Sequence, residues 1–190
     1  MKFKIRHLLL SLALASGVAH ADYEDGVNAA QAGDYATALK EFQLAADAGL
    51  DLAQYNLAIM YYTGRGVEQN YQTAFEWTVK AAEQGHLNAQ NNLGALYYTG
   101  TGTPVNFEKA LQWYSAAAQG QHADAQYNLS TMYELGEGTE KDLVRAHFWA
   151  QAAQFNEHAD AAELIERLAG QMTAAQISEA RTAFAQSMLE

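Results

Sequence analysis

The sequence predicts an all-α protein built from stacked helical hairpins, and an internal repeat is the main reason. The stretch from residue 53 to residue 88 returns twice, each time 36 residues later. Leucine, tryptophan and a pair of glycines recur at fixed places in all three copies, which chance rarely produces. These columns are Leu57, Leu93 and Leu129; Trp77, Trp113 and Trp149; Gly64, Gly100 and Gly136; and Gly66, Gly102 and Gly138. A two-helix unit cannot bury both of its faces alone, so stacked copies with terminal caps are expected.

Each copy is expected to contain two helices. The apolar side chains of the first helix fall on one stripe at about 100° per residue, and they are Ala53, Leu57, Met60 and Tyr61. Gly64 follows the last apolar position, where a left-handed residue commonly ends a helix. Asn70, Asn106 and Asp142 then stand where an N-cap is needed, so the second helix of the first copy should begin near Tyr71.

The spacing of these residues resembles the Sel1-like repeat, a relative of the tetratricopeptide repeat. The pattern consists of Ala-x-x-x-Leu, Tyr-x-x-Gly-x-Gly, Ala-x-x-Trp and Ala-Ala-Glu-Gln-Gly, and it runs closely from Ala53 to about Asp160. The resemblance implies a right-handed α-solenoid that binds other proteins and has no catalytic activity. Full repeats are expected at residues 53–88, 89–124 and 125–160. One departure is the turn after the second helix, where Gln121 stands in the column of Gly85.

The two ends of the chain are interpreted as an export signal and as capping segments. Residues 1–21 combine a basic start, a short apolar run and an Ala-His-Ala end, which is typical of a secretory signal peptide cleaved before Asp22. Residues 22–52 resemble a shortened N-terminal repeat. Residues 161–190 start a fourth copy, with Ala161 and Ile165 in the columns of Ala53 and Leu57, and a capping box at Thr173 opens a final helix that should seal the stack. Residues 22–190 therefore form one predicted domain.

The composition excludes several classes of function. The chain has no cysteine, so no disulfide framework supports it. Removal of the signal leaves eight basic against 22 acidic side chains, a net charge of about −14. Such a surface disfavours binding to nucleic acid and to anionic membranes. Membrane insertion is not predicted, and a monomer is expected.

No catalytic residue, cofactor or metal is predicted. His86, His122 and His158 share one repeat column, but equivalent positions of stacked helices lie about 10 Å apart, too far to share one zinc ion. They are interpreted as polar residues of the turns. The tryptophans are interpreted as core, and the acidic residues Glu134, Glu137 and Glu140 as a solvated loop.

The face of the first helices opposite the buried stripe is the candidate binding surface. Helical geometry places tyrosines there in several copies, and aromatic rings supply much of the contact area at protein interfaces. An asparagine ladder flanks the stripe and suits either a bound peptide backbone or bonds between helices. The candidate groove residues are Tyr55, Asn56, Ile59, Tyr62, Asn91, Asn92, Tyr98, Tyr127, Asn128 and Glu134.

The sequence therefore favours an exported, non-catalytic adaptor, periplasmic or secreted, that holds a protein or peptide. Two alternatives stay open at this point. One is an immunity or inhibitor protein for an envelope enzyme or toxin. The other is a binder of peptidoglycan or polysaccharide, because tyrosine and asparagine also suit sugars.

Overall fold

The computed structural model describes the backbone of residues 2–189 and the side chains of residues 17–189. Within these residues the regular structure consists of ten helices. Most of the expected signal segment, residues 1–16, lies outside the described side chains. The chain divides into two compact units, one that ends at Ala89 and one that begins at Gln90.

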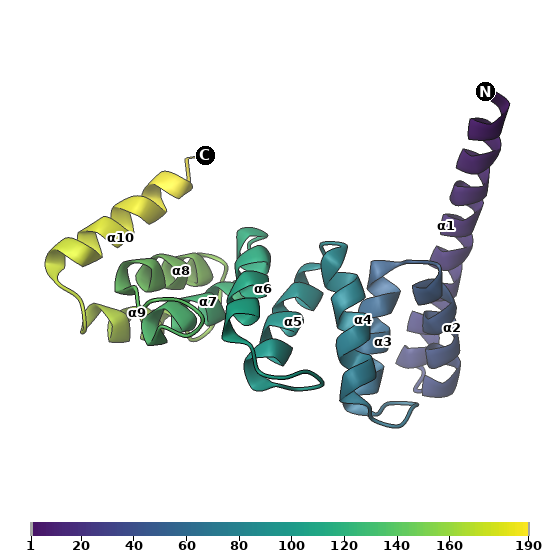
Figure 1. The fold of residues 1–190 in the computed structure, drawn as a ribbon, viewed down its shortest axis with the longest axis horizontal. Helices are drawn as coiled ribbons and strands as arrows, with labels where there is room; N and C mark the ends of the chain where they lie inside the picture. The colour runs from purple at the N-terminus through teal and green to yellow at the C-terminus, as the bar shows by residue number, and fades with distance from the viewer. Residues whose placement is uncertain (1, 190) are drawn as a thin grey trace. The chain divides into compact units, whose positions relative to one another are not determined.

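The first unit is a stack of helices joined by short turns. Its helices are α1 (Lys2–Gln31), α2 (Tyr35–Asp47), α3 (Asp51–Thr63) and α4 (Tyr71–Glu83). Helix α2 packs against both α1 and α3, and α3 packs against α4 (Figure 1). The core lies along these contacts and is formed by Ala38, Phe42, Ala45, Ala46, Ala53, Leu57 and Met60.

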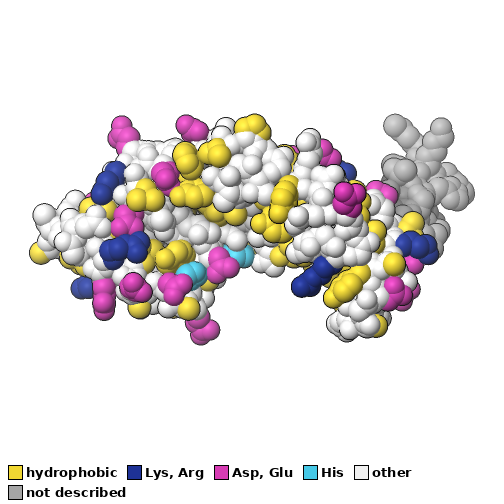
Figure 2. All heavy atoms as spheres, turned by 90° about the horizontal axis from the view of Figure 1, so that it is seen from below, with side chains coloured by type: hydrophobic (Ala, Val, Ile, Leu, Met, Phe, Trp, Pro, Cys, Tyr) yellow, Lys and Arg dark blue, Asp and Glu magenta, His cyan; other side chains and the backbone are white. Residues whose placement is uncertain are grey.

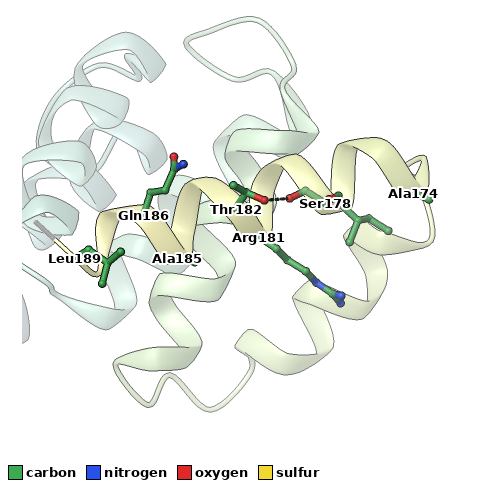
Figure 3. A pocket seen from close by; sticks show the side chains of 8 residues that line it. Ala174, Ser178, Arg181, Thr182, Ala185, Gln186 and Leu189 are labelled. Atoms are coloured by element: carbon green, nitrogen blue, oxygen red, sulfur yellow. Dashed lines mark hydrogen bonds between the residues drawn. The ribbon is translucent and has the colours of Figure 1, made fainter.

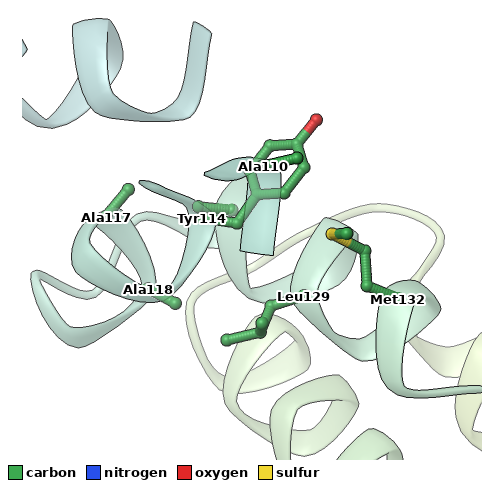
Figure 4. Packing of buried hydrophobic residues seen from close by; sticks show 7 residues of the cluster. Ala110, Tyr114, Ala117, Ala118, Leu129 and Met132 are labelled. Atoms are coloured by element: carbon green, nitrogen blue, oxygen red, sulfur yellow. The ribbon is translucent and has the colours of Figure 1, made fainter. Parts of the chain in front are cut away.

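The second unit continues the pattern and adds the C-terminal helices. Helix α5 (Leu87–Thr99) begins just before the boundary, and α6 (Phe107–Gln119), α7 (Ala123–Leu135), α8 (Leu143–Phe155), α9 (Ala161–Ala169) and α10 (Ala174–Ser187) follow. Helix α7 packs against α6 and α8, while α9 and α10 both pack against α8. Figure 4 shows one core cluster, in which Tyr114 and Ala110 of α6 face Leu129 and Met132 of α7. The prediction of stacked helical hairpins is confirmed.

The predicted starts and ends of the helices are confirmed by their hydrogen bonds. The side chain of Asn70 accepts a bond of 3.0 Å from the Thr73 amide at the start of α4. Asn106 and Asp142 cap α6 and α8 in the same way. Gly64 ends α3 with a φ of 71°, in the left-handed region. Local side-chain chemistry thus sets where α4, α6 and α8 begin.

The second glycine of two pairs also permits a close contact between consecutive copies of the same unit. A Cβ atom on Gly66 would lie 2.6 Å from the carbonyl oxygen of Tyr35, the first residue of α2. A Cβ on Gly138 would likewise collide with the carbonyl group of Phe107, the first residue of α6. The glycine loop of one copy therefore packs against the second helix of the copy before it, and no larger residue fits there.

The turns between copies keep one geometry although their residues differ. Gly85 has a φ of 89°, and Gln121 and Glu157 have φ values of 64° and 65° in the corresponding places. The residue that follows, a histidine each time, donates its backbone N–H to a carbonyl five residues earlier at 2.9–3.2 Å. The departure at Gln121 leaves the turn unchanged and places a non-glycine residue in a strained region.

The fourth copy is truncated, and one of its buried positions differs from the prediction. Ala161 is fully buried as expected, but the buried positions that follow are Leu164 and Leu168, while Ile165 is only half-buried. Ile165 thus shares the repeat column of Leu57, and Leu168 that of Met60, but Leu164 takes the fully buried place next to Ile165. No second hairpin helix covers α9, and its leucines pack against Ala146 and Ala150 of α8 instead.

The last helix caps the aromatic end of α8. The capping box at Thr173 is present, and Ala180 is fully buried. The ring of Phe184 packs edge-on against Phe148 and Phe155 of α8, with centroids 5.9 and 6.3 Å away. This agrees with the predicted sealing role of the C-terminal helix.

The tryptophan column borders the core and does not form its centre. All three tryptophans are half-buried, whereas the leucines of the first-helix column are fully buried. Trp77 and Trp149 pack against core clusters, and Lys80 lies 3.6 Å from the centre of the Trp77 ring. The central positions belong to leucines and alanines because a small side chain lets neighbouring helices approach closely.

Candidate functional site

The predicted first-helix face carries a pocket of about 210 Å³ in the second unit. Three of its lining residues, Tyr98, Tyr127 and Asn128, were predicted from the sequence, and Thr131 lies in the same column as Ile59. Tyr114, Met132 and Arg167 complete the lining. Helices α5, α6, α7 and α9 therefore contribute side chains to one concavity.

The first unit carries a related pocket of about 280 Å³. The predicted residues Asn56 and Ile59 line it, with side chains of α1 and α2 opposite them. Four lining positions of the two pockets are related by 72 residues, which is twice the repeat length: Phe42 and Tyr114, Asn56 and Asn128, Ile59 and Thr131, and Met60 and Met132. The repeat thus builds the same concavity in both units, with an apolar lining in the first and a tyrosine-rich lining in the second.

Tyr55 and Tyr127 each stack on a histidine of the following turn. The Tyr55 and His86 rings lie 4.5 Å apart, and the Tyr127 and His158 rings lie 4.2 Å apart and nearly parallel. The Nδ1 atom of His86 accepts the Ala89 amide hydrogen at 3.2 Å and so caps α5. The histidine column is therefore a structural feature of the turns, as predicted. Among the described side chains, no group of three or more His, Asp or Glu is placed to hold a metal ion.

The predicted asparagine ladder connects neighbouring helices. The side-chain amide of Asn56 donates to the Tyr23 hydroxyl at 3.4 Å, and that of Asn128 donates to Asn91 at 3.3 Å. Asn92 is half-buried. Of the two roles that the sequence allowed, the bonds of Asn56 and Asn128 show the structural one, and Asn128 still lines the pocket.

Tyr62 and Tyr98 occupy equivalent positions with different exposure. Tyr62 is 43 % exposed and packs edge-on against Tyr71. Tyr98 is half-buried, packs edge-on against Phe107, and donates its hydroxyl hydrogen to Glu137, which raises the pKa of Tyr98. Tyr98 lines the pocket of the second unit.

Glu134 does not belong to a solvated loop, and that interpretation is corrected. It lies in the last turn of α7 and is 7 % exposed. Its two carboxylate oxygens accept hydrogen bonds from Arg167 at 3.2 and 2.8 Å, and one of them also accepts from Gln171 at 2.9 Å. These bonds, those of Arg167 first, lower the pKa of Glu134. Its ion pair holds Arg167 at the pocket, so Glu134 supports the pocket from behind.

Sequence reasoning missed Arg167 and Tyr114. Tyr114 is 4 % exposed, and burial raises the pKa of its hydroxyl, which therefore stays protonated. Its hydroxyl is directed away from Leu129 in Figure 4. Arg167 lies in the truncated copy, in the repeat column of Ile59 and Thr131, and this column was an available signal. Tyr114 had a detectable signal, since it follows the repeat tryptophan and shares a column with Phe42.

A buried glutamine column was missed as well. The Gln126 amide nitrogen donates to the Ala118 carbonyl at 3.1 Å, and its oxygen accepts from Asn156 at 2.9 Å. Gln54 makes the equivalent bonds to Ala46 and Gln84. The same residue type in every copy, always after the buried alanine, was the available signal.

Two other concavities lie near the C-terminus. A hollow of about 620 Å³ runs along one face of α10, where Ser178, Arg181 and Thr182 project (Figure 3). Every lining residue belongs to that one segment, so no second element closes it. A pocket of about 210 Å³ between α6, α8 and α10 is lined by aromatic and amide side chains. Neither concavity contains a predicted groove residue.

Comparison with known proteins identifies the family. The model of the Sel1 repeat matches residues 51–86, 87–122 and 123–153, which together exceed half of the chain. The chain belongs to the Sel1 repeat family. Sel1 repeats generally mediate interactions between proteins, and the family consists generally of non-catalytic scaffolds. The right-handed α-solenoid predicted from the sequence is therefore the architecture of this Sel1 repeat chain.

Solved structures of other Sel1 repeat proteins resemble this one. A Sel1 repeat protein from Oxalobacter formigenes is 33 % identical, with a TM-score of 0.72 over 75 % of this chain. A protective antigen of uropathogenic Escherichia coli with an SLR fold is 28 % identical, with a TM-score of 0.78 over 92 % of this chain. The present chain covers 59 % and 39 % of these proteins, respectively.

A third structure shows the fold alone. The cysteine-rich protein B of Helicobacter pylori is 22 % identical, with a TM-score of 0.56 over 68 % of this chain and 96 % of its own. No curated protein matches this Sel1 repeat chain.

Proposed function

We propose that this Sel1 repeat chain is an exported, non-catalytic scaffold that holds a protein or peptide segment along the first-helix face. The tyrosine-lined pocket of the second unit is the observation that carries the proposal. Tyr98, Tyr114 and Tyr127 come from three different helices and surround one concavity. Tyrosine rings bury a large area with few rotors to immobilise, which is why they are common in the strongest contacts of protein interfaces.

The charge of the surface also fits a protein partner better than a polyanion or a membrane. Figure 2 shows acidic side chains spread along one face of the molecule, with hydrophobic side chains between them. None of the helices that the structure describes has the length and apolar character that a membrane span requires. A partner can therefore gain contact area on the apolar patches while the acidic groups restrict which partners approach.

The lining of the second pocket supports a binding role in preference to catalysis. Its titratable groups are three tyrosines and one arginine, and none of its lining residues is an acid, a histidine or a cysteine. The residue types that most often act as general bases or nucleophiles are thus missing from this lining. These side chains instead offer stacking and hydrogen bonding.

The export component of the proposal rests on the sequence of residues 1–21 and on the packing of α1. The α1 side chains in the adjoining core cluster are Tyr23, Val27, Ala29 and Ala30, which all follow the predicted cleavage point. Cleavage before Asp22 therefore leaves this cluster complete. N-terminal sequencing of the protein from periplasmic and culture-medium fractions should begin at Asp22. An intact Met1 in these fractions would contradict export with cleavage.

Photo-crosslinking in intact cells tests the scaffold function. A photoreactive residue replaces Thr131 in the pocket, and in the control it replaces Gln112, which is exposed on α6 outside the pocket. We expect one dominant protein to be captured from position 131 and none from position 112. Equal capture at both positions would refute the pocket as the binding face. Retention of a glycan at position 131 would instead support a polysaccharide binder.

A further inference from the structure

The two groove pockets share an unusual charge. Each contains one arginine, Arg65 in the first unit and Arg167 in the second, and neither has an acidic residue among its lining side chains. The whole chain contains 22 acidic and only 11 basic residues. Each pocket therefore presents one guanidinium group and no lining carboxylate in a strongly acidic protein, and the charge of Arg167 is balanced by Glu134 behind the pocket.

The unused hydrogen-bond capacity of the second pocket includes several donors. Arg167 uses its Nε and one terminal nitrogen on Glu134, which leaves the other terminal nitrogen without an acceptor among the residues that the structure describes. Tyr127 and Tyr114 each have a hydroxyl hydrogen, and the Tyr114 hydroxyl stays protonated because burial raises its pKa. Asn128 uses only one of its two amide hydrogens, on Asn91. A ligand that satisfies this set must be rich in acceptors.

Glu134 and Gln171 fix the orientation of Arg167. The bidentate pair leaves the guanidinium few alternative positions, and Gln171 holds the carboxylate in turn. The Glu134 side chain is 9 % exposed, whereas the Arg167 side chain is 48 % exposed and accessible from the pocket. A guanidinium oriented in advance loses less entropy when a second acceptor binds.

We propose that this pocket binds the side-chain carboxylate of an acidic residue in the partner, next to an aromatic side chain that stacks on the tyrosines. The inference rests on the proposed scaffold function and names the partner's chemistry. A side chain is favoured over a C-terminal carboxylate because both units carry an arginine pocket, and a partner chain has only one C-terminus. The acidic surface outside the pockets repels the same segment and so restricts where it binds.

Blocked tetrapeptides provide the test. The probe has the order Ala-Phe-Glu-Ala with both ends capped, and the matched probes carry Gln or Lys in place of Glu. Binding to the isotopically labelled protein without residues 1–21 is followed by NMR, through the Arg167 side-chain N–H signal and the Tyr127 ring. We expect the Glu peptide to shift both signals and to bind about tenfold or more tighter than the Gln peptide. Equal affinity for the Glu and Gln peptides, or tighter binding of the Lys peptide, would refute the inference.

Variants locate the effect at Arg167. Arg167→Gln should remove the preference for Glu over Gln, and Arg167→Lys should keep part of it, because lysine retains the charge but not the fork of donors. The control is Arg145→Gln, which alters a 65 % exposed arginine paired with Asp142 outside the pocket. An unchanged preference in Arg167→Gln would refute the assignment. The wild-type NMR shifts remain a test if that variant fails to fold.

Crosslinking at position 131 and the peptide titration test the scaffold function and the carboxylate chemistry separately. A protein captured at position 131, together with no preference for the Glu peptide, would leave the scaffold in place and refute only the carboxylate chemistry. Failure to capture any protein at position 131 would refute the scaffold proposal. A selective response to the Glu peptide in that case would leave a carboxylate-binding pocket without a protein partner.

Discussion

Replacing Gly66 with alanine should destabilise the protein much more than the same change at Gly85. Both residues have positive φ values, 72° and 89°, and forcing alanine into this region costs about 1–2 kcal/mol at either place. At Gly85 a Cβ would meet no atom within 4 Å. At Gly66 it would lie 2.6 Å from both the Cβ and the carbonyl oxygen of Tyr35, so the loop or α2 must move. Overpacking of this kind adds about 1–3 kcal/mol.

Urea unfolding followed by far-UV circular dichroism measures the difference. We expect a loss of about 1–2 kcal/mol in the unfolding free energy for Gly85→Ala and of about 2–5 kcal/mol for Gly66→Ala. The corresponding loss in melting temperature is about 2–4 °C for each kcal/mol in a chain of this size. Equal losses in the two variants would show that the contact between the Gly66 loop and α2 does not contribute, and that only the turn conformation requires glycine.

Gln121→Gly should raise the melting temperature by about 2–4 °C. Relief of the left-handed strain at this position, about 1–2 kcal/mol, exceeds the entropy cost of glycine, about 0.5–1 kcal/mol. A lower melting temperature would show that the Gln121 side chain is stabilising. Glu134→Gln should lower the unfolding free energy by about 2 kcal/mol at neutral pH. Arg167 lowers the pKa of Glu134 below 4.5, so the difference in unfolding free energy between the wild type and this variant should be complete above about pH 4.5. The difference should disappear as the pH falls through the lowered pKa. A difference that persists in acid would contradict the ion-pair explanation. Trp113→Ala should cost about 2 kcal/mol in urea unfolding, less than the 3–5 kcal/mol of a fully buried ring, because Trp113 is half-buried.

The sequence was sufficient for features set by neighbouring residues. Asn70 and Gly64 determine where helices begin and end through bonds within a few residues, so their roles were predictable. The repeat columns also identified Tyr98, Tyr127 and Asn128, which the structure brings to one pocket.

The features missed by the sequence depend on contacts between distant segments. Arg167 lies in the repeat column of Ile59 and Thr131, but its place at the pocket depends on an ion pair with Glu134 of another copy. Glu134 looked solvated because its partner Arg167 lies 33 residues away. The ion pair leaves no periodic signal, because the earlier copies have no charged residue in either of these two columns. Which partner the chain binds depends on side chains outside it and is not encoded in the repeat.

The loop contact at Gly66 and Gly138 gives the stack a direction. In each case a later copy supports the first turn of a helix in an earlier copy, and the reverse support does not occur through these loops. We therefore expect fraying that starts at the C-terminal side to weaken the copy before it, while fraying at the N-terminal side leaves these supports intact. Hydrogen exchange would then show that each unit loses protection first at its later copy, so that local unfolding has a preferred polarity within each unit.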